Sequence, residues 1–172
     1  MTADHIRGAS EAVVTLVGYG DYMCALSARA SHIIDVVMAE LGDSIRFVFR
    51  NFPRAGNATA LTAAEAAESV AHRAGPAAFW RMHAIIFANQ DALEVDDLLT
   101  YAEAAGADRQ QVADDLVSGA MRARVLEQAD GARRAGVDEA PAFFVNGLPL
   151  EVDWMDVDEF VDELRRLTPI PS

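Results

Sequence analysis

The sequence predicts an α/β fold in a single domain, in which two strand-containing segments are separated by a long all-helical one. Three observations lead to this prediction: an apolar, β-branched run that ends shortly before a cysteine, a middle section with helical periodicity and no strand signal, and an Asn-Gly turn between two short apolar runs. With 172 residues, of which 52% are hydrophobic, the chain can bury one sizeable core.

The first segment predicts a β-α-β unit. Residues 12–19 form a nearly continuous apolar and β-branched run, which is typical of a strand buried on both faces. From Cys24 to Leu41 apolar residues recur at helical spacing, and Gly42 follows where a C-terminal cap is expected. Residues 44–52 alternate between apolar and polar side chains and predict the second strand. The cysteine therefore lies where the first strand passes into a helix.

The middle of the chain predicts helices only, and the end predicts a hairpin and a last helix. Asn146-Gly147 favours a tight turn, because both central residues of a type I′ turn need positive φ. Residues 156–167 carry one apolar stripe and predict the final helix. We place the core at about 12–56 and 137–168 and the insertion at about 57–136. The helices expected in the insertion are 59–73, 77–89, 95–105, 109–117 and 119–135.

Several segments resemble one family in both content and order. They are Val17-Gly18-Tyr19-Gly20-Asp21-Tyr22-Met23-Cys24-Ala25-Leu26-Ser27, Phe47-Val48-Phe49-Arg50-Asn51-Phe52-Pro53, Phe79-Trp80-Arg81-Met82-His83 and Gly136-Val137-Asp138-Glu139-Ala140-Pro141-Ala142-Phe143-Phe144-Val145-Asn146-Gly147. Together they resemble the DsbA-like branch of the thioredoxin superfamily. The resemblance implies a thioredoxin fold with an inserted all-helical subdomain and the activity of a thiol-disulfide oxidoreductase. The chain departs from the family pattern at two places: Ser27 stands where a second cysteine is usual, and Glu139-Ala140 replaces Gly-Thr.

The resemblance also implies a site. Cys24 and Ser27 are the expected catalytic residues, and Tyr22, Ala140 and Pro141 are the expected substrate contacts, with Pro141 in a cis peptide bond facing the cysteine. A helix N-terminus stabilises a thiolate, which is the nucleophile in disulfide exchange. Ser27 cannot attack a mixed disulfide, but its hydroxyl can donate a hydrogen bond to the thiolate. With serine in place of the second cysteine, this is a monothiol (CxxS) variant. An external thiol such as glutathione would then have to complete turnover.

Three functional hypotheses remain open at this point. The first is monothiol disulfide exchange with a thiol- or disulfide-bearing protein or with glutathione. The second is a redox-inactive module that keeps a peptide-binding groove, and the third is a glutathione-dependent isomerase or transferase of the kappa type. The third needs a cationic anchor for carboxylates, whereas Glu139 is expected to disfavour acidic ligands. Asp21, Asp138 and Glu139 are interpreted as solvated loop acids.

Composition excludes several other functions. The chain has 14 basic and 27 acidic side chains, and its formal net charge of -13 disfavours nucleic acids and anionic membrane surfaces as partners. One cysteine excludes an intramolecular disulfide, and three of the histidines (His32, His72 and His83) lack the spacing of a metal site. The first ten residues contain no apolar leader and no long apolar run follows, so we expect no membrane insertion and a cytoplasmic location, or export if a signal peptide has been removed.

Overall fold

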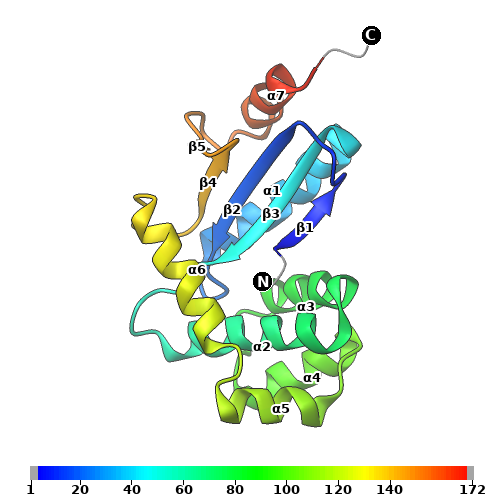
Figure 1. Cartoon of the computed structure of the whole chain (residues 1–172), viewed down its shortest axis with the longest axis vertical. Helices are drawn as coiled ribbons and strands as arrows, with labels where there is room; N and C mark the ends of the chain where they lie inside the picture. The colour runs from blue at the N-terminus through cyan, green and yellow to red at the C-terminus, as the bar shows by residue number, and fades with distance from the viewer. Residues whose placement is uncertain (1–3, 170–172) are drawn as a thin grey trace.

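A five-stranded mixed sheet forms the centre of the computed structural model, which describes residues 4–169 (Figure 1). The strand order is β1-β3-β2-β4-β5; β2 and β3 are parallel, and each remaining pair is antiparallel. This arrangement confirms the predicted β-α-β unit and the later hairpin. The strands are β1 (His5–Gly8), β2 (Val14–Gly20), β3 (Ile45–Asn51), β4 (Ala142–Val145) and β5 (Leu148–Pro149).

Two glycines in β2 make room for aromatic rings from the neighbouring strands. A Cβ added at Gly18 would lie 2.9 Å from the Phe47 ring and 3.0 Å from the Phe143 ring. At Gly20 it would lie 2.7 Å from the ring of Phe49. These distances are shorter than van der Waals contact, so the rings pack against the strand backbone where a larger residue would displace them.

Helices cover the sheet and form a separate group beyond one end of it (Figure 1). α1 and α7 pack against each other, and Phe160 of α7 contacts Phe143 of β4 with ring centroids 5.4 Å apart. Helices α2–α6 occupy the chain between β3 and β4, as expected for the insertion. The helices are α1 (Ala25–Leu41), the 3-10 turn η1 (Gly42–Ser44), α2 (Ala58–Ala74), α3 (Pro76–Ala88), α4 (Val95–Ala105), α5 (Arg109–Ser118), α6 (Arg122–Arg134) and α7 (Val157–Leu167). Within residues 4–169, no helix is long and apolar enough to cross a membrane.

The hairpin forms at the predicted turn. Asn146 has a φ of 49° and Gly147 a φ of 83°, so both central residues have the positive φ that a tight turn requires. The Asn146 side-chain oxygen also accepts a hydrogen bond of 2.8 Å from the backbone N–H of Thr15. The turn is thereby tied to the start of β2.

The predicted start of the core, at about residue 12, was wrong because β1 precedes it. β1 pairs antiparallel with β3 and forms an edge of the sheet. Its four residues, HIRG, carry no apolar alternation, so local pattern does not indicate a strand. Tertiary contacts stabilise it instead: the His5 ring is buried and stacks on Phe79 at a centroid distance of 3.5 Å. Residues 1–3 of this polar N-terminal stretch lie outside the described part of the chain.

A buried polar cluster connects β1 and β3 to the helical insertion. The Glu68 carboxylate on α2 lies 2.7 Å from His5 Nε2 and accepts hydrogen bonds from Asn51 at 2.8 Å and Arg124 at 2.5 Å. Burial by itself would raise the pKa of Glu68, but the hydrogen bond with His5 and the charges of His5 and Arg124 outweigh it and lower the pKa. One carboxylate therefore holds two strands and two helices together.

We expect Glu68→Ala to lower the free energy of unfolding by about 3–5 kcal/mol, because the change removes a buried acceptor shared by His5, Asn51 and Arg124. Urea denaturation followed by circular dichroism measures the effect. The matched control is Glu163→Ala, which breaks a surface pair with Arg166 and should leave the midpoint almost unchanged. Equal, small effects of the two substitutions would contradict a stabilising role for the buried cluster.

Candidate functional site

Cys24 lies at the N-terminus of α1, immediately after the loop that follows β2. It is the N-cap residue, with extended backbone angles (φ -91°, ψ 121°), and its carbonyl accepts the hydrogen bond from Ala28 N–H at 3.1 Å. The side chain is half-buried. The sulfur is thus held at the helix end whose free N–H groups favour negative charge.

The segment before β4 meets this cysteine. Cys24 Sγ lies 3.6 Å from the carbonyl oxygen of Ala140, to which the thiol donates a hydrogen bond, and the Ala140–Pro141 peptide bond is cis. These residues are 116 positions apart in the sequence. The fold therefore brings together Cys24, Ala140 and Pro141, as the resemblance implies.

Ser27 lies one turn along α1 and is buried. Its Oγ accepts a hydrogen bond of 3.1 Å from the backbone N–H of Asp21. That bond uses an acceptor position of the hydroxyl and leaves its hydrogen for donation. The thiol hydrogen bond of Cys24 goes to Ala140, so a bond from Ser27 to a Cys24 thiolate stays a prediction.

The interpretation of Asp21 as a solvated loop acid was wrong. Its side chain is buried, and its two carboxylate oxygens accept hydrogen bonds from the backbone N–H groups of Met23 at 2.8 Å and Arg54 at 3.0 Å. Those two groups belong to the cysteine loop and to the loop after β3. Asp21 therefore fixes both loops at the ends of the parallel strands.

Tyr22 was expected to contact substrate, and the structure contradicts this. Its side chain is only 1% exposed, packs on Phe49 and Phe87, and forms a hydrogen bond of 2.9 Å with His83 Nδ1. Burial, with a smaller effect of the Glu68 charge, raises the pKa of Tyr22 well above its usual value. Tyr22 supports the site from the core, because its ring packs between Phe49 of the sheet and α3, away from solvent.

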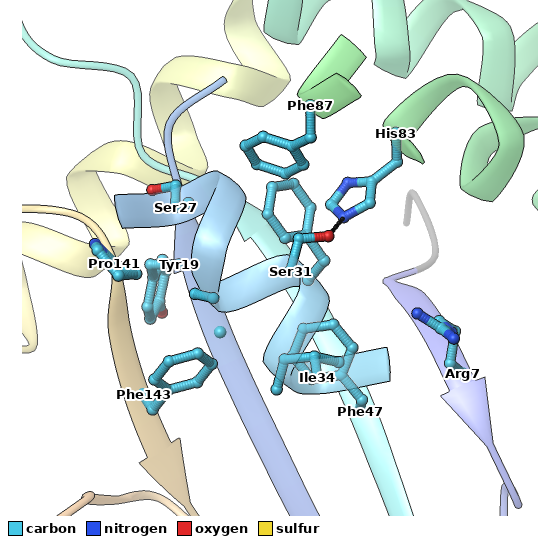
Figure 2. A pocket seen from close by; sticks show the side chains of 14 residues that line it. Arg7, Tyr19, Ser27, Ser31, Ile34, Phe47, His83, Phe87, Pro141 and Phe143 are labelled. Carbon is cyan, nitrogen blue, oxygen red and sulfur yellow. Dashed lines mark hydrogen bonds between the residues drawn. The ribbon is translucent and has the colours of Figure 1, made fainter. Parts of the chain in front are cut away.

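A small pocket of about 20 Å³ lies beneath the site, between α1 and the sheet (Figure 2). Ser27 and Pro141 border it on the cysteine side, and Ser31 and His83 border it on the side of α3. Ser31 Oγ lies 3.4 Å from His83 Nε2, at the dashed line in Figure 2. Burial, followed by the nearby charges of Arg7 and His5, lowers the pKa of His83 to about 3. The imidazole is therefore neutral at pH 7.

Nothing in the sequence indicated a role for Gln90. This residue lies in the loop between α3 and α4, and its side-chain Nε2 donates hydrogen bonds to the carbonyl oxygens of Tyr22 at 2.9 Å and Cys24 at 3.0 Å. A glutamine in a polar loop, 66 residues from the cysteine, has no local signal that could have revealed this contact. Gln90 holds the cysteine loop from the side of the helical insertion.

A surface groove of about 610 Å³ opens beside the sulfur. Its charged residues have both signs: Arg54 and Arg133 on one hand, and Asp21, Asp138 and Glu139 on the other. Glu139 was expected to disfavour acidic ligands, and the structure adds two cationic side chains to the same groove that the sequence did not indicate. The remaining lining residues are Met23, Cys24, Leu26, Phe52, Ala55, Asn57 and Ala140.

Two hydrophobic side chains border the groove next to the cysteine. Met23 and Leu26 flank Cys24 and are exposed by 39% and 48%, respectively, so apolar surface is presented beside the sulfur. Among residues 4–169, no group of three or more His, Cys, Asp or Glu side chains has the arrangement of a metal site. The arrangement can therefore present a nucleophilic sulfur to a ligand bound through polar, charged and apolar contacts.

Protein stability should depend on pH through His83. Because its folded-state pKa of about 3 lies below the ordinary value of 6.5, the unfolded chain takes up this proton first. The contribution of neutral His83 is thus complete above about pH 6.5 and is lost as the pH falls toward 3, at up to about 1.4 kcal/mol per pH unit. His83→Gln keeps an acceptor for Tyr22 but does not titrate, so urea denaturation between pH 7 and 4 should show a shallower loss than in the unsubstituted protein. Parallel curves for the two proteins would contradict this assignment.

The family model described as thioredoxin matches residues 1–163. Similar folds occur in BdbD from Bacillus subtilis, with 22% identity, a TM-score of 0.84 and coverage of 95% of this chain and 92% of that one. A thioredoxin-like oxidoreductase from Silicibacter pomeroyi has 24% identity and a TM-score of 0.75, with coverage of 94% and 91%. DsbA from Mycobacterium tuberculosis has 19% identity and a TM-score of 0.74, with coverage of 96% and 92%.

Curated relatives are much longer proteins. The Na(+)/H(+) antiporter NhaA 1 of Mycolicibacterium vanbaalenii is 37% identical over 154 residues, which are 88% of this chain and 24% of the antiporter. The antiporter of the same name from Salinispora arenicola is 37% identical over 145 residues, or 84% of this chain and 22% of its own length. The chain thus spans about a quarter of the length of these relatives. The fold, with its helical insertion, is similar to that of BdbD and DsbA. From the match over residues 1–163, the chain belongs to the thioredoxin family.

Proposed function

We propose that the protein carries out thiol-disulfide exchange through Cys24 as its single nucleophile. One observation carries the proposal: the half-buried Sγ lies at a helix N-terminus, at the mouth of a groove of about 610 Å³ and 3.6 Å from the Ala140 carbonyl beside the cis Pro141. The free N–H groups of a helix N-terminus favour the negative charge that develops on an attacking sulfur, and a groove beside it can orient the sulfur of a partner. The partner is a thiol- or disulfide-bearing protein or a small thiol compound.

The exchange step conserves atoms and electrons. The Cys24 thiolate attacks one sulfur of a partner disulfide, a new S–S bond forms between them, and the other partner sulfur leaves as a thiolate and takes a proton from water. Cys24 is oxidised in this step, and the leaving sulfur is reduced. The backbone groups of Ala140 can form hydrogen bonds with an extended partner segment during the attack. The alanine side chain contributes no polar group of its own, so only the backbone takes part.

Release of the mixed disulfide needs a second thiol from outside the chain. Cys24 is the only cysteine, and the hydroxyl of Ser27 is not a nucleophile for disulfides under ordinary conditions. A free thiol such as glutathione can attack the mixed disulfide and return Cys24 to its reduced form. The same substitution of Ser27 for a second cysteine favours one alternative, a peptide-binding module without turnover.

The first test is formation of a mixed disulfide. Incubation with oxidised glutathione should add one glutathionyl group to the protein, because Cys24 is partly exposed, lies at a helix end and lines the groove. Intact mass spectrometry measures the adduct, and Cys24→Ser is the matched control that should gain no mass. An unmodified protein after prolonged incubation with excess reagent would rule out the exchange chemistry. Partner binding that Cys24→Ser leaves intact, combined with that result, would identify the binding module.

A gain of function should follow from Ser27→Cys. Position 27 lies one helical turn from Cys24, so the introduced thiol can attack the mixed disulfide, release the bound thiol and leave an intramolecular disulfide with Cys24. We expect the glutathione adduct of this variant to decay without added thiol, whereas the adduct of the unsubstituted protein persists. Mass spectrometry after removal of free reagent follows the decay, with Ser27→Ala as control. Equal persistence in all three proteins would contradict the proposed role of position 27.

A further inference from the structure

Two arginines of the groove, Arg54 and Arg133, take no part in the exchange step described above. Arg54 is exposed and follows β3, and its backbone N–H is fixed by the Asp21 carboxylate at 3.0 Å. Within residues 4–169, its guanidinium group has no hydrogen bond or ion pair with another side chain. A cation held at its base and without an ionic partner is available to an anionic ligand.

Arg133 reaches the same groove from the last turn of α6. Its guanidinium lies over the Phe52 ring at 5.4 Å from the centroid, and its Nη1 donates to Asp130 at 2.8 Å. Arg133 and Asp130 are exposed by 43% and 59%, so this pair is solvated and weak, and the other N–H groups remain available. The aromatic ring positions the guanidinium beside the groove.

The acidic residues of the groove do not occupy the N–H groups of these arginines. Asp21 uses its two oxygens on the backbone N–H groups of Met23 and Arg54, and the exposed Asp138 and Glu139 form no salt bridge with either arginine in the described chain. Charge screening in physiological salt acts over about 8 Å, so distant acidic residues that contribute to the net charge of -13 have little effect on the groove. The groove therefore offers two guanidinium groups with unused N–H donors in the same hollow as Cys24.

We propose that the groove selects thiols and disulfides that carry carboxylate groups, with Arg54 and Arg133 holding the carboxylate while the ligand sulfur meets Cys24. This inference rests on the proposed exchange at Cys24 and specifies its substrate class. Guanidinium groups bind carboxylates through paired N–H···O bonds, and a volume of about 610 Å³ is in the range of small-molecule sites. A partner protein with acidic residues next to a cysteine presents the same combination of carboxylate and sulfur. The two arginines also border a neighbouring hollow of about 390 Å³ with Leu61 and Leu126, which a longer segment could enter.

Three small disulfides of similar size separate charge from reactivity: dithiodipropionate with two carboxylates, bis(2-hydroxyethyl) disulfide without charge, and cystamine with two ammonium groups. The rate of adduct formation at Cys24 is measured by mass spectrometry for each reagent, with the unsubstituted protein and with the Arg54→Gln/Arg133→Gln variant. The ratio of the two rates cancels the intrinsic reactivity of each reagent. The matched control is Arg134→Gln plus Arg165→Gln, which removes the same charge from exposed arginines that do not line the groove.

We expect the groove variant to react about fivefold more slowly with dithiodipropionate, equally fast with the neutral reagent, and no more slowly with cystamine. The control variant should match the unsubstituted protein with all three. If the neutral reagent modifies Cys24 but the dicarboxylate rate is unchanged in the groove variant, the inference is wrong and the exchange function stands. If no reagent modifies Cys24, the proposed function itself is wrong.

A final comparison distinguishes the two sources of the carboxylate. Oxidised glutathione and a disulfide-linked peptide with aspartates beside its cysteine are each reacted with the unsubstituted and groove variants. A loss confined to glutathione and dithiodipropionate identifies a small-molecule substrate. A loss larger for the peptide identifies an acidic protein segment, and no loss for any of them overturns the proposal.

Discussion

The site depends on the buried carboxylate of Asp21 at the end of β2. Its two oxygens accept N–H groups from Met23 and Arg54, and its own backbone N–H donates to Ser27. A buried carboxylate with satisfied hydrogen bonds is strongly directional, and losing one of its partners would leave a costly unpaired charge. The turn that presents Cys24, the first turn of α1 and the loop that carries Arg54 are thereby held in one geometry.

The parallel pairing of β2 with β3 explains why these parts meet. The carboxyl ends of parallel strands lie at the same edge of a sheet, so the loops after Gly20 and Asn51 emerge side by side. β4 runs antiparallel to β2 and therefore begins at that same edge, where its preceding residues Ala140 and Pro141 reach the sulfur. The insertion adds Arg133 as a wall of the groove. The groove is thus a product of strand order, with its charge supplied by loops and by α6.

The fold could be predicted from the sequence where local pattern and global structure agree. The buried run of β2, the spacing of α1 and the Asn146-Gly147 turn each carry a local signal strong enough to identify the element. The sequence of β1 carries no such signal. Its stability comes from pairing with β3 and from the burial of His5. A strand that is stabilised only by distant residues cannot be recognised from its own four residues.

The site was partly predictable for the same reason. Cys24, Ala140 and Pro141 belong to recognisable motifs, whereas the groove arginines and Gln90 reach the site from loops and helices far away in sequence. Tyr22 was misassigned because a residue next to an exposed loop can still point inward, and only the position of α3 decides this. Sequence motifs locate the reacting atom, and tertiary structure determines which charges surround it.

The Gln90 amide has a consequence for how the molecule can move. Since one side-chain nitrogen donates to the carbonyls on both sides of Met23, the loop between α3 and α4 and the cysteine loop are mechanically joined. Any rotation of the helical group relative to the sheet must either break both contacts or carry the sulfur with it. Movement of the helical insertion and the position of the nucleophile are therefore coupled through a single uncharged side chain, whose hydrogen bonds salt would not screen.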